Sequence, residues 1–133
     1  MAQRNAIWLV IPIALAAWAS NAASAGPVRI SFWHTGDDGL SQRLADQVEN
    51  TFERSPDFAL SHGQEPDTLV VTIPQNVEWK QVGRRVRALY TVEFSSTDGR
   101  KLGRSSGSCW DDRLSKCAAQ ILKNAKLAAS KIR

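Results

Sequence analysis

The stretch from Arg84 to Cys109 alternates between apolar and polar residues over more than four repeats in its first half. A period of two residues is typical of a β-strand with one face on a core. The turn signal Asp98-Gly99 follows, because glycine tolerates positive φ and aspartate bonds neighbouring backbone. The stretch therefore predicts a long β-hairpin that ends at Cys109, with five inward residues: Val86, Ala88, Tyr90, Val92 and Phe94.

The first 25 residues have the three parts of a secretory signal peptide. Arg4 precedes a mainly apolar run, and Ala-Ser-Ala precedes Gly26. The apolar run is shorter than the roughly 20 residues that span a bilayer. We therefore expect cleavage near Ala25, a periplasmic or secreted protein without a membrane span, and a single small domain over residues 26–133.

The charge of the expected domain is mildly basic. Of the 17 Lys and Arg only Arg4 lies before residue 26, and all 13 Asp and Glu follow it, so residues 26–133 carry a formal charge of +3. This value is well below the basicity typical of nucleic-acid-binding domains. It is compatible with attraction to an anionic glycan or a lipid head group.

Two cysteines, Cys109 and Cys117, are expected to form a disulfide, because thiols of exported proteins are usually oxidised and the count is even. Two free structural thiols are the alternative. Four ligands at the spacing of a zinc site are missing. The short loop between the cysteines predicts a stabilisation of about 2–3 kcal/mol.

The remaining elements follow from hydrophobic periodicity. Leu40, Leu44, Val48 and Phe52 recur every four residues and predict an amphipathic helix, which Asp37 or Asp38 caps and which ends at Ser55-Pro56. The other expected elements are strands at 28–32 and 68–73, a short edge piece at 58–61, and a connection at 75–83. A second helix is expected from a cap at Asp111-Asp112 to Ala129. Its buried stripe consists of Leu114, Ala118, Ile121, Ala125 and Ala128, and Leu122 and Leu127 widen that stripe.

The order of these elements is β-α-(β)-β-β-β-α. It predicts the α+β class, with two helices packed on one mainly antiparallel sheet of four to five strands.

One candidate site is the loop with His34, Asp37 and Asp38, at the end of the first strand. Here His34 could act as a general base or, with an aspartate, as a metal ligand. The more conservative interpretation makes Asp38 a helix cap and His34 an exposed polar residue, with no metal and no cofactor. The sequence shows no recognisable catalytic constellation.

A second candidate is a binding surface made of five cations on the hairpin and two tryptophans outside it. The cations could bind an anionic partner, although basic residues on an outer strand also prevent edge aggregation and keep a domain soluble. The tryptophans could form a recognition patch or cap the core. The members of this surface are Arg85, Arg87, Arg100, Lys101, Arg104, Trp33 and Trp79.

About half of the expected domain resembles a periplasmic α/β domain found in several envelope proteins. The matching pieces are the helix end at 54–58, the strands at 67–73 and 88–94, and the turn Asp98-Gly99. The chain looks like the amino-terminal domain of TolB, like CsgG, and like the lipoprotein activators of penicillin-binding proteins. The resemblance implies a non-catalytic envelope module that works through contacts with another envelope protein.

The sequence therefore favours an exported binding or assembly accessory. The alternatives are a periplasmic or secreted enzyme, or an enzyme inhibitor, that uses the loop from His34 to Asp38, and a binder of anionic envelope polymers that uses the basic face of the hairpin.

Overall fold

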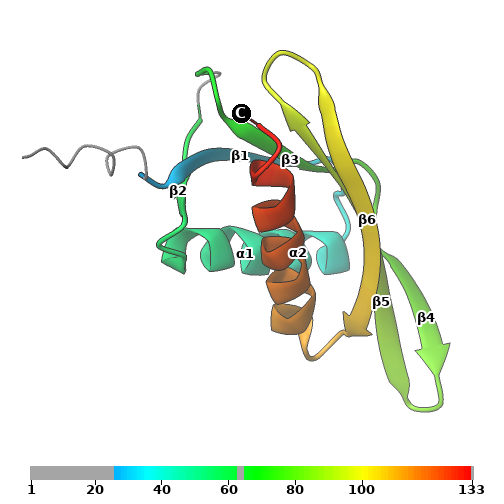
Figure 1. Cartoon of the computed structure of the whole chain (residues 1–133). Coiled ribbons are helices and arrows are strands. Elements are labelled where there is room, and N and C mark those ends of the chain that lie inside the picture. The colour runs from blue at the N-terminus through cyan, green and yellow to red at the C-terminus, as the bar shows by residue number, and fades with distance from the viewer. Residues whose placement is uncertain (1–25, 63–64, 133) are drawn as a thin grey trace, which may run out of the picture.

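The computed structural model describes residues 26–62 and 65–132, so the expected signal peptide lies outside the described residues. The chain forms six strands and two helices (Figure 1). Their bounds are β1 (Val28–His34), α1 (Gly39–Arg54), β2 (Phe58–Leu60), β3 (Leu69–Ile73), β4 (Glu78–Val82), β5 (Arg85–Ser96), β6 (Lys101–Trp110) and α2 (Leu114–Ala129).

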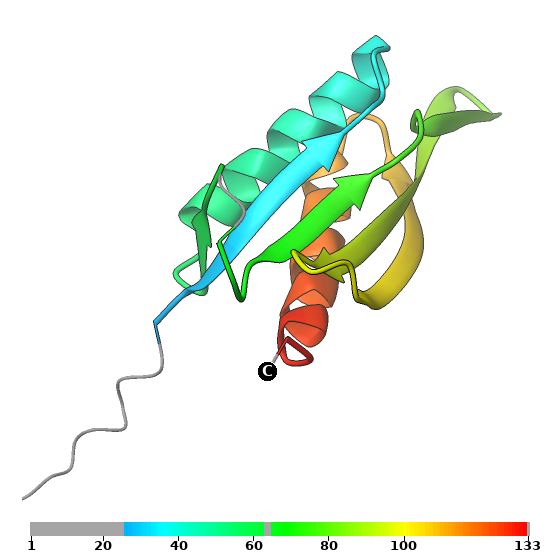
Figure 2. The same ribbon diagram turned by 90° about the horizontal axis from the view of Figure 1, so that it is seen from above.

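The 12-residue strand β5 organises the sheet, because it pairs antiparallel with three other strands. Glu93 of β5 pairs with both β3 and β6, and Leu89 pairs with both β4 and β6. The strands β3 and β4 therefore share one edge of β5, and β6 occupies the other edge. On the far side of β3, β1 pairs parallel with β3 and with β2, which completes a mixed sheet (Figure 2).

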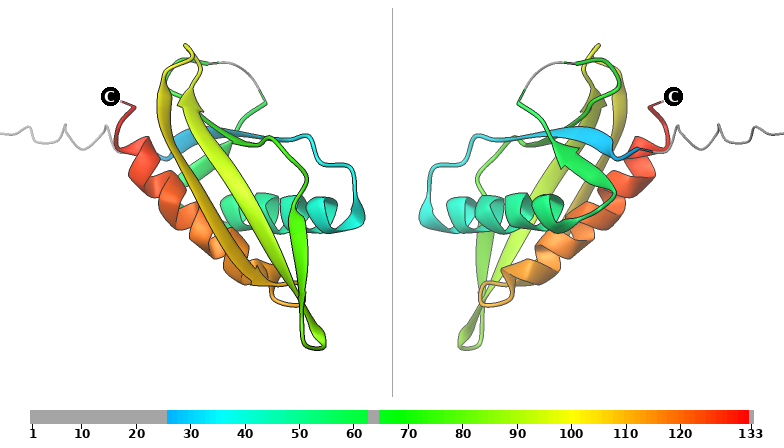
Figure 3. Two further views of the ribbon diagram at one scale, coloured as in Figure 1. Left: turned by 90° about the vertical axis from the view of Figure 1, so that its right-hand side faces the viewer. Right: turned by 90° about the vertical axis from the view of Figure 1, so that its left-hand side faces the viewer.

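Both helices pack on one face of this sheet and cross each other beside it (Figure 3). The even-numbered residues of β5 face them, and Ala88, Tyr90, Val92 and Phe94 are buried as predicted. Every fourth residue of α1 from Leu44 to Phe52 is also buried. The predicted stripe of α2 is buried too, except that Leu127 is 62% exposed, so the expectation that Leu127 widens it is wrong.

The predicted α+β class with two helices on one sheet is confirmed, and the sheet contains one strand more than expected. The additional strand is β4, in the segment 75–83 that the sequence assigns to a connection. All five residues of β4 are exposed, so they carry no apolar alternation. The strand forms through backbone pairing with β5 around a turn at Gly83, whose φ of 63° favours glycine.

Candidate functional site

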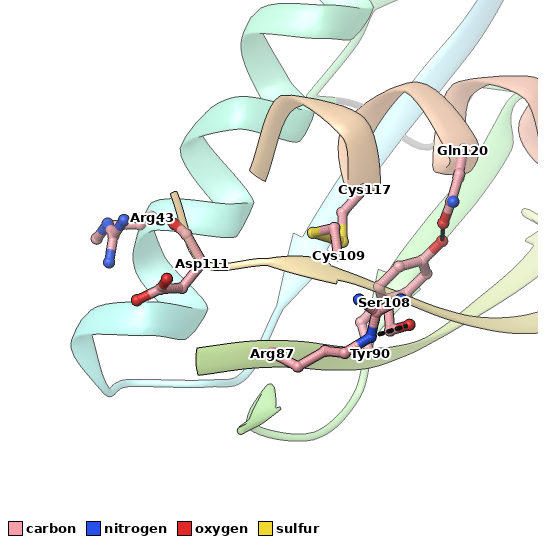
Figure 4. Close-up of a disulfide and its surroundings, with 8 residues drawn as sticks. All are labelled: Arg43, Arg87, Tyr90, Ser108, Cys109, Asp111, Cys117 and Gln120. Atoms are coloured by element: carbon pink, nitrogen blue, oxygen red, sulfur yellow. Dashed lines mark hydrogen bonds between the residues drawn. A yellow bond between two sulfur atoms is a disulfide. The ribbon is translucent and has the colours of Figure 1, made fainter. Parts of the chain in front are cut away.

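The disulfide between Cys109 and Cys117 is confirmed, and it joins the end of β6 to the second turn of α2 (Figure 4). The two Cα atoms are 5.6 Å apart. Cys109 pairs with Ala88 on the inward face of the sheet, which is why its sulfur reaches the helix. The bond therefore fixes α2 to the strand pair β5–β6.

A polar contact beside the disulfide connects the same elements. The buried Tyr90 hydroxyl donates to Gln120 Oε1 of α2 at 3.0 Å (Figure 4). Gly107 of β6 lies against both side chains, since a Cβ at that residue would be 2.4 Å from the Tyr90 oxygen. Burial raises the pKa of Tyr90 above its ordinary value, because the buried site disfavours the phenolate.

The predicted loop site lies at the carboxyl end of β1. His34 is exposed, and its ring stacks on Phe32 with 6.0 Å between ring centroids. The Asp38 carboxylate caps α1 and accepts from the Ser41 backbone N–H at 2.7 Å. Hydrogen bonds from the hydroxyl and backbone of Ser41 lower the pKa of Asp38. The loop therefore starts α1 with one of its two predicted cap residues.

The other polar groups near this loop join it to the chain after β3. The Ser41 hydroxyl accepts from the buried Val77 N–H at 2.8 Å, and Asn76 Oδ1 accepts from the Asp37 N–H at 3.2 Å. Gly36 lies between these two contacts, and a Cβ there would be 2.6 Å from the Ser41 Cβ. Close packing thus holds the start of α1 against the end of β3.

The second helix begins differently from the prediction. Its N-cap is Arg113, which makes no side-chain cap hydrogen bond, so the expected cap at Asp111-Asp112 is wrong. Asp112 instead pairs with Arg85 at 3.2 Å, and the backbone carbonyl of Asp111 accepts from Arg43 at 2.8 Å. Because α2 begins at Leu114, both aspartates lie before the N-cap residue Arg113.

The structure divides the predicted basic surface into two groups at opposite ends of the β5–β6 pair. At one end, the Arg85 and Arg87 guanidinium carbons lie 4.0 and 4.8 Å from the ring centroid of Trp110. Near the other end, Arg100 donates to the Ile132 carbonyl at 3.0 Å. The exposed Lys101 and Arg104 belong to this second group.

The turn beside the second group is held by Asp98. Its carboxylate accepts from the Ser96 hydroxyl and lies 3.6 Å from Arg100. The pKa of Asp98 is lowered, first by the Ser96 hydrogen bond and then by the backbone N–H and charge of Arg100. Asp98 and Arg100 thus form contacts that stabilise the turn itself.

The first group lines an open depression of about 430 Å³ beside Trp110. Two further cations, Arg113 and Lys116, line it from the start of α2. No local pattern in the sequence indicates these two cations, because they meet Arg85 and Arg87 only when α2 folds back on β6. The expected disulfide between Cys109 and Cys117 was the available signal, since it brings the start of α2 to the end of β6.

The two tryptophans of the predicted surface lie on other strands than the cations, Trp33 on β1 and Trp79 on β4, which pairs with the part of β5 that carries Arg85 and Arg87. Trp33 is 54% exposed, and its indole N–H donates to Ser31 Oγ on the face of the sheet opposite the helices. Trp79 is 63% exposed and lies on β4. Val82, on the same strand, is 44% exposed. The structure therefore does not bring the seven predicted surface residues together.

A larger depression of about 750 Å³ contains none of the predicted residues. It lies between the start of β1, the segment around Phe58 and the end of α2, and the ion pair of Lys126 with Asp57 is on its wall. Within residues 26–62 and 65–132, no group of three or more His, Cys, Asp and Glu side chains could hold a metal ion. No helix in those ranges is long and apolar enough to cross a membrane.

No protein-family model matches the sequence, and no curated protein matches it significantly. Solved structures, in contrast, match the fold. A Xanthomonas campestris protein of the DUF330 family has a TM-score of 0.59 at 9% identity, over 82% of this chain and 91% of the other. A minor lipoprotein from Acinetobacter baumannii has a TM-score of 0.56 at 10% identity, over 79% and 93%.

A third similar structure is PelC from Paraburkholderia phytofirmans, a dodecamer, with a TM-score of 0.51 at 10% identity, over 77% of this chain and 86% of the other. These three structures are neither TolB nor CsgG. The resemblance expected from the sequence is therefore supported only at a coarser level. The chain shares its fold with a minor lipoprotein and with a protein of the DUF330 family.

Proposed function

We propose that this protein is an exported, non-catalytic accessory of the cell envelope that works by contacting another envelope protein through its β4–β5 hairpin. One observation carries the proposal. Trp79 and Val82 are 63% and 44% exposed on a strand with no buried residue. The hairpin also projects from the body of the molecule, at the lower end of Figure 1.

Exposed side chains of this kind favour a protein partner over a purely solubilising role. Burying a large apolar side chain contributes about 1.5–3 kcal/mol, and tryptophan is enriched among the residues that dominate interface energies. A hairpin that served only solubility would carry charged residues at these positions. The hairpin therefore has the composition of a contact surface.

The geometry of the strand specifies the kind of contact. Trp79 pairs with Ala88 on the helix side of the sheet, whereas Val82 pairs with Arg85 on the opposite side. Within the described residues, β4 pairs with β5 alone. An extended partner segment added to the free edge of β4 would meet both side chains, because alternate residues of an added strand point to opposite faces.

The similar structures add support of a coarser kind. A minor lipoprotein and a DUF330 protein share the fold, and PelC with the same fold forms a dodecamer. A small domain of similar fold can thus serve as a unit of a larger assembly.

Photo-crosslinking in the native envelope tests the proposal. A photoreactive residue at position 79 should crosslink one defined partner, and Val82→Asp should abolish that crosslink. A matched control places the same residue at Leu127, which is 62% exposed on α2, and should not give this product. The proposal is overturned if position 79 gives no discrete product, and the partner assignment is overturned if the product is only a second copy of this chain.

A further inference from the structure

We propose that the depression beside Trp110 is a binding site for a doubly charged oxyanion of the phosphate monoester class. It is separate from the hairpin contact proposed above and does not depend on it. The site is defined by Arg85, Arg87, Arg113 and Lys116, together with Ser108 and Trp110. These residues come from β5, β6 and the start of α2.

Positive charges converge at the ring of Trp110. The guanidinium carbons of Arg85 and Arg87 lie 4.0 and 4.8 Å from the centroid of one indole ring, that of Trp110. Two cations held by one ring repel each other, and an anion between them removes that repulsion. The fork of N–H donors on each guanidinium matches the oxygens of a phosphate.

The charges around the depression are predominantly positive. Four cations line it, and none of its lining residues is acidic. Within the described residues, one ion pair reaches this group, that of Arg85 with Asp112 at 3.2 Å, and both side chains are about half exposed or more. Four cations suit a dianion better than a single carboxylate. Asp112 would then compete with the ligand for Arg85.

Contacts within the protein already order the site. Arg87 Nε donates to Ser108 Oγ at 3.2 Å, which fixes its guanidinium along β6 (Figure 4). The disulfide of Cys109 and Cys117 joins β6 to α2 directly beside Trp110 and Lys116. The uncapped start of α2 at Arg113 adds the positive end of the helix dipole. A preformed site loses little conformational entropy when it binds a ligand.

The test uses protein expressed from the full chain and two probes at low salt. Inorganic phosphate is titrated while the indole N–H signal of Trp110 and the Arg87 Nε–H signal are followed by NMR. Vesicles that contain phosphatidic acid, whose head group is a phosphate monoester, are tested by cosedimentation, with phosphatidylcholine vesicles as the neutral comparison. Saturable shifts with phosphate identify a soluble phosphate ligand, whereas binding only to anionic vesicles places the phosphoryl group on a lipid.

Variants of matched charge separate a built site from general basicity. Arg85→Ala with Arg87→Ala should weaken binding at least tenfold, whereas Lys101→Ala with Arg104→Ala should change it less than twofold. The variant Arg85→Lys with Arg87→Lys keeps the charge and loses the forks, so it should show an intermediate loss.

A gain of affinity provides a result that misfolding cannot produce. Asp112→Asn frees Arg85 and should raise affinity severalfold, whereas Glu53→Gln, an exposed carboxylate of α1, changes the net charge equally and should have little effect. The proposal is overturned if neither probe binds at low salt, if both double alanine variants lose affinity equally, or if Asp112→Asn does not exceed Glu53→Gln.

Discussion

Gly107 is the position where a single added methyl group should do the most damage. It lies on the inward face of β6, paired with Tyr90 of β5. A Cβ at residue 107 would be 2.4 Å from the Tyr90 hydroxyl oxygen and 2.7 Å from its Cζ. Tyr90 is 4% exposed and bonded to Gln120, so its ring cannot move aside without losing that bond. We predict that Gly107→Ala lowers the free energy of unfolding by about 1–3 kcal/mol, the usual range for an overpacked core.

Gly103 provides the matched control on the same face of the same strand. It pairs with Phe94, and an added Cβ would have its nearest neighbour at 3.9 Å, which is ordinary van der Waals contact. Replacing glycine by alanine at an unstrained position stabilises a protein by about 0.4–1 kcal/mol, because the unfolded chain loses freedom. Gly103→Ala should therefore be neutral or mildly stabilising.

Urea unfolding followed by far-ultraviolet circular dichroism measures both variants. Tyr90→Phe removes the atom nearest to the added methyl group but leaves Cζ at 2.7 Å. Gly107→Ala should therefore lower the free energy of unfolding less in the Tyr90→Phe background than in the natural protein, although some loss should remain. Equal unfolding midpoints for Gly107→Ala and Gly103→Ala would refute the packing argument, and so would the absence of any coupling with Tyr90.

Three further predictions concern contacts elsewhere in the fold. Replacing Cys109 and Cys117 by serine should lower the free energy of unfolding by about 2.5 kcal/mol, as the chain-entropy model gives for so short a loop, and a comparable loss should follow reduction of the natural protein during thermal unfolding. Ser41→Ala removes the acceptor of the buried Val77 N–H and should cost about 1–3 kcal/mol, with faster hydrogen exchange at that amide as the site-specific readout. The pKa values of Asp38 and Asp98 are lowered from about 3.8 in the folded state, so the stability that these carboxylates contribute is present above that pH and is lost as the pH falls through their folded pKa values. Asp38→Asn with Asp98→Asn should therefore flatten the dependence of the urea midpoint on pH below about 4, and an unchanged slope would contradict this assignment.

The elements that could be predicted from the sequence are those in which buried and exposed side chains alternate with a regular period. The alternation of β5 identifies its inward face, since successive side chains of any strand point to opposite sides. The four-residue spacing from Leu44 to Phe52 identifies the buried stripe of α1 in the same way. The two cysteines could be paired because only two were available.

The elements that escaped prediction are held by contacts that leave no local pattern. Strand β4 forms through backbone hydrogen bonds while all its side chains are exposed. The expected cap of α2 was wrong because the helix begins one residue after Arg113, so that Asp112 precedes the N-cap and pairs with Arg85 of β5 instead. The depression beside Trp110 has the same origin, since Arg113 and Lys116 reach it only in the folded chain. Such sites depend on the tertiary arrangement rather than on local spacing.

The triple pairing of β5 also determines where the chain can change in length during evolution. An insertion of one residue inside a strand turns every following side chain to the other face. In β5 that change would disturb the registers of β3, β4 and β6 together, since all three align with it. The exposed turn at Gly83 joins β4 directly to β5. Additional residues in this turn would therefore only lengthen the projecting hairpin. Divergent relatives should therefore keep the length of β5 and differ in the length of this hairpin tip.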